Sequence, residues 1–205
     1  MEKFTTLQSV AAPLPIANIN TDVVIRIERM SKHGRGELGP WALEALRLRP
    51  DGSEDPEFIL NRPGYRGARI LLAGANFGCG SSREMAVWAL EEIGIRCIIA
   101  PSFGDIFFGN CLQNGVLAIR LPDSTVEALV ERASRGAAQA LLTVDLVHQE
   151  IRHEGGSVPF EIEPLARESL LQGLDPIAVT LQRESDIAAF EARDCLARPW
   201  LFAST

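Results

Sequence analysis

Features that would cross-link a small secreted protein or hold a structural metal are scarce in this sequence. Its 205 residues include four cysteines, and no two of them form a C-x-x-C pair. Their spacing matches no zinc pattern, and a chain of this length can bury a normal hydrophobic core without disulfides. We therefore expect no metal bound by this chain and a reducing, cytoplasmic location.

Long apolar runs and positive charge are lacking as well. No run of about 18 apolar residues occurs, which argues against a transmembrane helix. The segment MEKFTTLQSV lacks the apolar core of a signal peptide. The formal net charge is −7, whereas nucleic-acid binding requires a basic face. We expect neither a membrane nor a nucleic acid as partner, and an anionic ligand would have to be held by local arginines.

What the sequence does have is an ordinary globular composition, with 46% hydrophobic residues, and a regular centre. Continuous apolar segments alternate there with segments of helical pattern, which is typical of parallel βαβ units. We expect strands at 68–75, 96–100 and 115–121, helices at 83–93 and 124–135, and a loop followed by a helix at 102–114.

The segment before this centre is less regular. Residues 1–25 are expected to be extended, with an Asn/Asp-rich turn followed by the short strand VVI. The stretch 26–40 mixes glycine with charged residues and is expected to be a mobile loop. A short helix is expected at 41–48.

The C-terminal third changes character. Residues 141–163 indicate two or three antiparallel strands, with a Gly-Gly turn between the last two. Helices are expected at 164–172 and 174–192. The patterns together predict one α/β domain over residues 1–205. It should have a mostly parallel sheet flanked by helices, a small antiparallel β extension and a helical extension at 164–205.

Residues 74–84, GANFGCGSSRE, carry the strongest chemical signal. They follow an expected buried strand and open a helix, which is where open α/β sheets bind ligands. Helix N-termini attract anions, glycines at 78 and 80 allow close approach of the backbone, and Arg83 can bind a carboxylate through two nitrogens. A Walker A loop would require a lysine that is absent here. The segment therefore predicts a carboxylate or phosphate site.

Two other interpretations of this segment stay open on the residues alone. Ser81 and Glu84 form the S-x-x-E pattern of a capping box, which would make them structural. Cys79 precedes a helix start, where a thiol becomes more acidic, and could act as a nucleophile. The chain has only three histidines, and none forms a recognisable pair with this cysteine.

The string NFGCGSSRE and the later IIAPSFGDIFFGN resemble the swivel domain of the aconitase superfamily. The resemblance is closest to the family of isopropylmalate dehydratase small subunits and extends to NINTDVVI (18–25) and GLDPIAVTLQRESDIAAFEA (173–192). It implies a chain that acts only with a large subunit that holds a [4Fe–4S] cluster, while this chain binds no cofactor itself. The implied reaction converts 2-isopropylmalate to 3-isopropylmalate by dehydration and rehydration in leucine biosynthesis.

The resemblance also implies roles for individual residues. Ser81 is expected to be the catalytic base, and Asp22 is expected near the active site as a second catalytic residue. Substrate binding is expected from Ser82, Arg83 and the backbone at Gly80.

Some residues depart from the family pattern. Met85 and Val87 stand where leucine-pathway members often have histidine and proline, and Arg26 stands where proline is common. The implied substrate-recognition loop, 26–39, is basic, whereas an isopropyl group would suit an apolar loop. Arg35 and Arg26 are therefore candidates for binding a second carboxylate.

The substrate consequently stays open. Citraconate or citramalate, methylated malates and homoaconitate remain alternatives to isopropylmalate. A stand-alone carboxylate-binding module is an alternative without chemistry.

Overall fold

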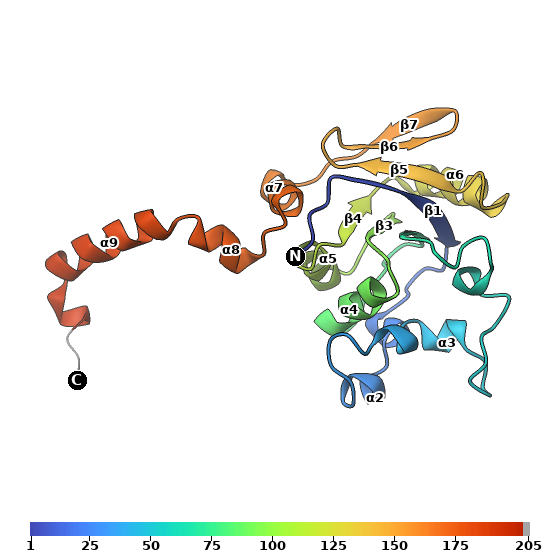
Figure 1. Ribbon diagram of the computed structural model, residues 1–205, viewed down its shortest axis with the longest axis horizontal. Helices are drawn as coiled ribbons and strands as arrows, with labels where there is room; N and C mark the ends of the chain where they lie inside the picture. Colours follow the sequence, from blue (N-terminus) through green and yellow to red (C-terminus); the bar gives the residue numbers. More distant parts are fainter. Residues whose placement is uncertain (203–205) are drawn as a thin grey trace.

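The computed structural model describes residues 1–202 and is built on a seven-stranded mixed sheet (Figure 1). The spatial order of the strands is β4-β3-β2-β1-β5-β6-β7. Their bounds are β1 Thr6–Leu14, β2 Ile70–Ala73, β3 Cys97–Ala100, β4 Leu117–Arg120, β5 Leu141–Asp145, β6 Glu150–His153 and β7 Gly156–Pro159. The three predicted central strands are confirmed, each shorter than its apolar run.

Strand β1 joins two differently built parts of this sheet. Its first half, Thr6–Val10, pairs antiparallel with β5, and its second half, Ala11–Leu14, pairs parallel with β2. Strands β2, β3 and β4 continue the parallel part, whereas β5, β6 and β7 continue the antiparallel part. The α/β class with an antiparallel extension is confirmed. The two parts contribute equal numbers of strand pairings, so the parallel part is less dominant than predicted.

Three helices cover the parallel part of the sheet. They are α4 (Glu84–Glu92), α5 (Asp105–Gln113) and α6 (Asp123–Ser134). Helix α6 packs against β1, β2 and β3, whereas α4 and α5 pack against each other on the other side (Figure 1). All residues of β2 and β3 are buried, because the parallel part is covered on both faces. The predicted central helices are confirmed.

The segment between β1 and β2 differs from the prediction. The residues VVI do not form a strand. Instead, α1 (Thr21–Val24) is a single helical turn, because the Asn20 side chain accepts a hydrogen bond from Val23 N and caps it. The 26–40 stretch contains α2 (Ile27–Met30) and is tied to the body by contacts described below. The further short helices are η1 (Gly39–Trp41), α3 (Glu44–Arg47) and η2 (Ile59–Asn61).

The C-terminal helices leave the body of the molecule. Helix α7 (Pro164–Gln172) is anchored by Leu170, which is buried and whose carbonyl accepts a hydrogen bond from Phe4 N at 2.9 Å. Helices α8 (Pro176–Leu181) and α9 (Glu184–Ala197) and the turn η3 (Pro199–Leu201) follow, and Figure 1 shows them extending from the body as an arm. The prediction of one continuous helix at 174–192 is therefore wrong, because a turn at residues 182 and 183 separates α8 from α9.

Neither α8 nor α9 has a buried residue. Across residues 1–202, no helix is long and apolar enough to cross a membrane.

Candidate active-site loop

The loop that follows β2 requires glycine where it meets its neighbours. A Cβ on Gly78 would lie 2.1 Å from Cγ of Phe107, and Gly78 has φ +70°, a left-handed value that L side chains disfavour. A Cβ on Gly74 would lie 2.5 Å from the carbonyl carbon of Ile16. The glycines thus let the loop lie directly against α5 and against the chain that leaves β1.

Backbone hydrogen bonds hold this loop on both sides. Toward β1, Gly78 N donates to Ile19 O at 2.7 Å and Thr21 N donates to Cys79 O at 2.9 Å. Toward β3, Gly104 N donates to Phe77 O at 2.9 Å. The loop therefore continues the parallel strand order beyond the strands themselves, at their carboxyl edge.

Ser81 and Ser82 are both exposed, and neither caps helix α4. The helix begins at Glu84 with Arg83 as N-cap residue and no side-chain cap bond. The capping-box prediction is wrong, because Glu84 accepts a hydrogen bond from Asn114 Nδ2 at 2.8 Å instead. The Ser81 carbonyl accepts a hydrogen bond from Thr21 Oγ1 at 3.1 Å. This bond fixes the backbone of Ser81 and does not involve its hydroxyl group.

The first N–H groups of α4 have no partners within the helix and no side-chain cap. They carry the positive end of the helix dipole. This end of α4 lies directly after the two serine hydroxyls, so the arrangement suits an anionic ligand.

Arg83 forms an ion pair with Asp22. The Arg83 side chain is 14% exposed, whereas the Asp22 side chain is 55% exposed and lies in the first turn of α1. The structure thus places Asp22 beside the Gly80–Arg83 segment, and its role in catalysis stays a prediction. In this position, the Asp22 carboxylate can orient the Arg83 guanidinium.

The two remaining predicted residues have partners elsewhere. Arg26 pairs with Glu44 at 3.3 Å, and Arg35 pairs with Glu91 at 3.1 Å. Neither arginine makes a hydrogen bond or ion pair with the Gly80–Arg83 segment in the described structure. Their role in substrate binding stays a prediction.

Sequence reasoning missed two residues of this region. Thr21 lies inside the NTD motif, and its side chain bonds to the loop that carries Ser81. Ile27 is 55% exposed on α2, within a loop that was interpreted as basic. The signal available in the sequence was an isoleucine flanked by charged residues within 26–39.

Cys97 and Cys111 are buried and suit neither thiol chemistry nor the ligation of an iron–sulfur cluster. Burial raises the pKa of the Cys97 and Cys111 thiols, whereas cluster ligands are thiolates. Cys195 is exposed on the distant α9, and Cys79 lies in the loop. Over residues 1–202, no group of three or more His, Cys, Asp or Glu side chains could hold a metal ion.

The histidines make their contacts away from Cys79. His33 lies beside Trp41, His148 beside Asp145, and His153 beside the Glu154 carbonyl. Within residues 1–202, these contacts show no Cys/His arrangement that would support the thiol-enzyme interpretation.

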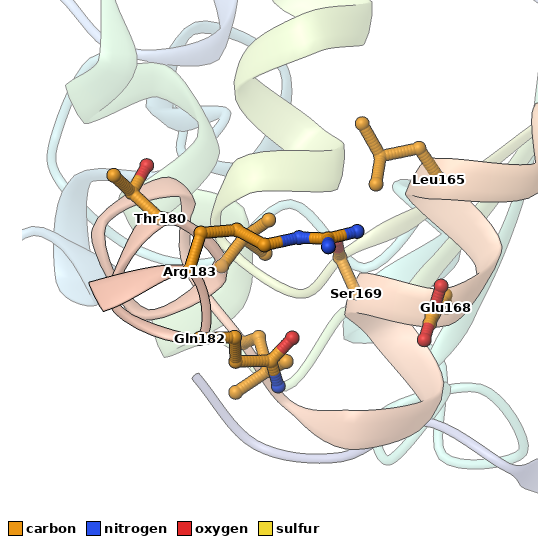
Figure 2. Close-up of a pocket in the computed structure, with 8 residues that line it drawn as sticks. Leu165, Glu168, Ser169, Thr180, Gln182 and Arg183 are labelled. Atoms are coloured by element: carbon orange, nitrogen blue, oxygen red, sulfur yellow. The ribbon is translucent and has the colours of Figure 1, made fainter. Parts of the chain in front are cut away.

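Two pockets of the molecule lie at the base of the C-terminal arm. One of about 380 Å³ lies between α7 and α8; Figure 2 shows Arg183 reaching across it toward Ser169. A second, of about 440 Å³, lies between α5, α7 and α8. Neither is lined by residues 74–84. A smaller pocket of about 180 Å³ is lined by Gly74 and Ala75, but not by Ser81, Ser82 or Arg83. The two serines are exposed, so the candidate site lies on a surface that a partner could complete.

The chain combines a mixed seven-stranded sheet with a glycine-rich loop that ends in two exposed serines and a paired arginine, and the comparisons give its class as aconitase-type. A family model described as the aconitase C-terminal domain matches residues 1–124. Another, described as the C-terminal domain of the 3-isopropylmalate dehydratase small subunit, matches residues 177–204. The chain belongs to the family of 3-isopropylmalate dehydratase small subunits.

Similar proteins span its whole length. The 3-isopropylmalate dehydratase small subunit of Paramagnetospirillum magneticum is 53% identical over 202 residues, covering 98% of this chain and 100% of the relative. That of Afipia carboxidovorans is 52% identical over 202 residues with the same coverage.

A solved structure supports the fold. The 3-isopropylmalate dehydratase (leuD) of Methanocaldococcus jannaschii matches with a TM-score of 0.66 and 24% identity, covering 90% of this chain and 98% of that chain.

Proposed function

We propose that this chain is the small subunit of a 3-isopropylmalate dehydratase, which interconverts 2-isopropylmalate and 3-isopropylmalate by dehydration and rehydration. The observation that carries the proposal is the Gly80–Arg83 segment. It places two exposed hydroxyls and an oriented guanidinium at the uncapped start of α4. This arrangement occurs in a chain whose full-length relatives are named for that enzyme.

Arg83 binds a carboxylate of the substrate. Its ion pair with Asp22 holds the guanidinium in place, and a guanidinium still has further N–H groups for a second carboxylate. Ser82, the backbone at Gly80 and the first N–H groups of α4 add hydrogen-bond donors around the same anion. Asp22 acts on the substrate through Arg83.

Ser81, in its alkoxide form, accepts the proton from the carbon next to a substrate carboxylate, and the electron pair of that C–H bond forms the carbon–carbon double bond. A serine is a weak base in water, so its oxygen requires a positive environment. The N-terminus of α4 and Arg83 supply that environment, and closure of a partner over the loop excludes water. The hydroxyl group leaves from the neighbouring carbon as hydroxide. Rehydration then adds a hydroxyl group to the carbon that lost the proton and a proton to the carbon that lost the hydroxyl group.

The partner is a large subunit that holds the [4Fe–4S] cluster. The cysteines of this chain do not fit a cluster, so the group that takes the leaving hydroxyl is assigned to that subunit. Three exposed isoleucines support a partner at this edge. Ile16 and Ile106 follow the carboxyl ends of β1 and β3, and Ile27 lies on α2.

The domain organisation and location follow the same proposal. The chain forms one swivel-type domain, with 26–39 as substrate-recognition loop and a helical extension from residue 164, in the cytoplasm. Residues 203–205, which belong to the predicted ranges 1–205 and 164–205, lie outside the described residues. The basic residues Arg26 and Arg35 already have carboxylate partners, which weakens the case that either of them binds a second carboxylate of the substrate.

Co-expression with a cluster-bearing large subunit under anaerobic conditions tests the proposal. Alkene formation from isopropylmalate, followed by ultraviolet absorbance, should require both subunits. Ser81→Ala should lower kcat by about 10²–10⁴-fold, because the proton acceptor is lost, while the complex still forms. Ser82→Ala is the matched control and should mainly raise KM.

Turnover of citramalate or another diacid, but not of isopropylmalate, would change the substrate assignment. Carboxylate binding by the isolated chain, with full function in Ser81→Ala, would instead favour a stand-alone binding module.

A further inference from the structure

Helix α4 ends in a way that its own electrostatics disfavour. Its last two residues are Glu91 and Glu92, and its last turn contains no basic residue. The C-terminus of a helix carries partial negative charge, so carboxylates there oppose the dipole. Such a local conflict indicates that the side chains interact favourably with something outside the helix.

Every hydrogen-bond partner of these two carboxylates in the described structure comes from residues 35–39. Glu92 accepts three backbone N–H bonds, from Gly36 at 2.7 Å, Leu38 at 2.6 Å and Gly39 at 2.7 Å. Arg35 donates to Glu91 at 3.1 Å. We call residues 35–39 the clamped segment.

The approach between the clamped segment and α4 is close. A Cβ on Gly39 would lie 3.1 Å from Cβ of Glu92, so the backbone at that point rests on the helix. The guanidinium of Arg35 lies 5.2 Å from the ring centre of Trp88, one turn earlier on α4. Charge, hydrogen bonds and packing therefore act on the same segment.

The beginning of the same loop is held by a different carboxylate. Glu44, which is buried, pairs with Arg26 at 3.3 Å and with Arg29 at 3.0 Å. Arg29 also stacks on Trp41 at 3.6 Å. Residues 30–34 lie between these two attachments.

We propose that Glu92 is a positioning residue of the substrate site. It fixes the clamped segment to the helix whose first residue follows Arg83. The nine residues of α4 span about 13 Å. The carboxylate-binding end of the site and the recognition loop are thereby held as one body. The inference rests on the proposed function, in which 26–39 recognises the substrate side chain.

The first test measures the clamp directly and needs no activity. Glu92→Ala and Glu92→Gln should both raise amide hydrogen exchange at residues 36–39 and speed tryptic cleavage within 26–39. Four trypsin sites lie in that loop: Arg26, Arg29, Lys32 and Arg35. Exchange should rise by about tenfold or more in Glu92→Ala, with a smaller rise in Glu92→Gln, which keeps one acceptor oxygen.

Glu131→Gln is the matched control. Glu131 is also a helical carboxylate paired with an arginine, Arg135, but it lies on α6 and does not contact the loop. In this variant, the rates of amide hydrogen exchange and of tryptic cleavage within 26–39 should equal those of the wild type. Unchanged protection of residues 36–39 in Glu92→Ala would overturn the clamp.

The second test uses the assembled two-subunit enzyme. Glu92→Ala should raise KM for isopropylmalate by about tenfold, with kcat changed less than KM. It should also reduce the preference for isopropylmalate over citramalate, whose side chain is smaller. A purely structural role would instead lower the active fraction and reduce turnover of both substrates equally.

An unchanged preference in a variant with a demonstrably released loop would overturn the inference. An inactive wild-type pair would count against the proposed function, and the exchange experiment would still decide whether Glu92 holds the loop.

Discussion

Gly78 affects the loop through the side chain that it lacks. Gly78→Ala would place a methyl group against Phe107, whose buried ring also packs edge-on against Phe77 with centroids 5.5 Å apart. It would also force a left-handed φ on an alanine. We expect a loss of unfolding free energy of about 2–5 kcal/mol, combining backbone strain and overpacking.

Urea denaturation measures this loss. Gly67→Ala is the control, because a Cβ there meets nothing within 4 Å and should change stability by less than about 0.5 kcal/mol. Equal effects of the two substitutions would contradict the close approach of the loop to α5.

At the scale of residues, the sequence identified the loop but not every interaction of its side chains. Glycine, serine and arginine at this position indicated an anion site, and the structure gathers Asp22, Ser81, Ser82 and Arg83 there. The capping box did not form because Glu84 bonds to Asn114, while the Thr21 hydroxyl holds the Ser81 backbone from another distant segment. Local spacing cannot show a bond between residues that are sixty positions apart.

Among the elements, the turn between β5 and β6 depends on one carboxylate. The backbone N–H of His148, at 2.9 Å from Asp145 Oδ1, is the main cause that lowers the pKa of Asp145. The imidazole of His148 at 3.1 Å and Arg152 at 3.4 Å add to it. The folded state therefore favours the ionised form.

This lowered pKa predicts a dependence of stability on pH. The stabilisation is present above the pKa of an unfolded aspartate, about 3.9, and is lost as the pH falls through the lower folded value. Asp145→Asn should lower Tm at pH 7 by about 2–6 °C, and the difference should shrink below about pH 3. Thermal unfolding followed by circular dichroism at both pH values measures it.

Glu161→Gln, which neutralises an exposed carboxylate just after β7, should leave Tm unchanged at both pH values. A pH-independent deficit in Asp145→Asn would show that the substitution acts by packing rather than by charge.

Elements with a strong periodic pattern were predictable, whereas those set by single contacts were not. The runs ILLA and CIIA are continuous and apolar, so burial on both faces of a parallel sheet followed directly. The VVI segment has strand-forming residues, yet the Asn20 cap converts most of it to α1. The mixture of glycine and charge in 26–40 predicted a mobile loop, and its local sequence could not show that Glu44, Glu91 and Glu92 hold it.

At the scale of the molecule, the C-terminal arm is separable from the core. Truncation after Asp175 removes α8 and α9, which contribute no buried residue, and should change Tm by less than about 2 °C. Truncation after Glu163 also removes α7 with the buried Leu170, and should cost about 2–5 kcal/mol.

Calorimetry on the two shortened chains compares them directly. A large destabilisation from the shorter deletion would mean that the arm packs on the body more than the described contacts indicate. The arm could be predicted as helical from sequence, but its separation from the body could not. Its exposed apolar residues, such as Leu196 and Trp200, resemble core positions in composition.

The double role of β1 also separates the molecule into two regions with different tolerance to inserted sequence. Every residue assigned to the site lies at the carboxyl edge of the parallel part or in the loop 26–39. Among the paired strands of residues 1–202, the antiparallel strands join this part through the first half of β1. The turn at Glu154 and Gly155, between β6 and β7, is thus a place where a fluorescent reporter or a tether could be grafted without altering the geometry around Ser81.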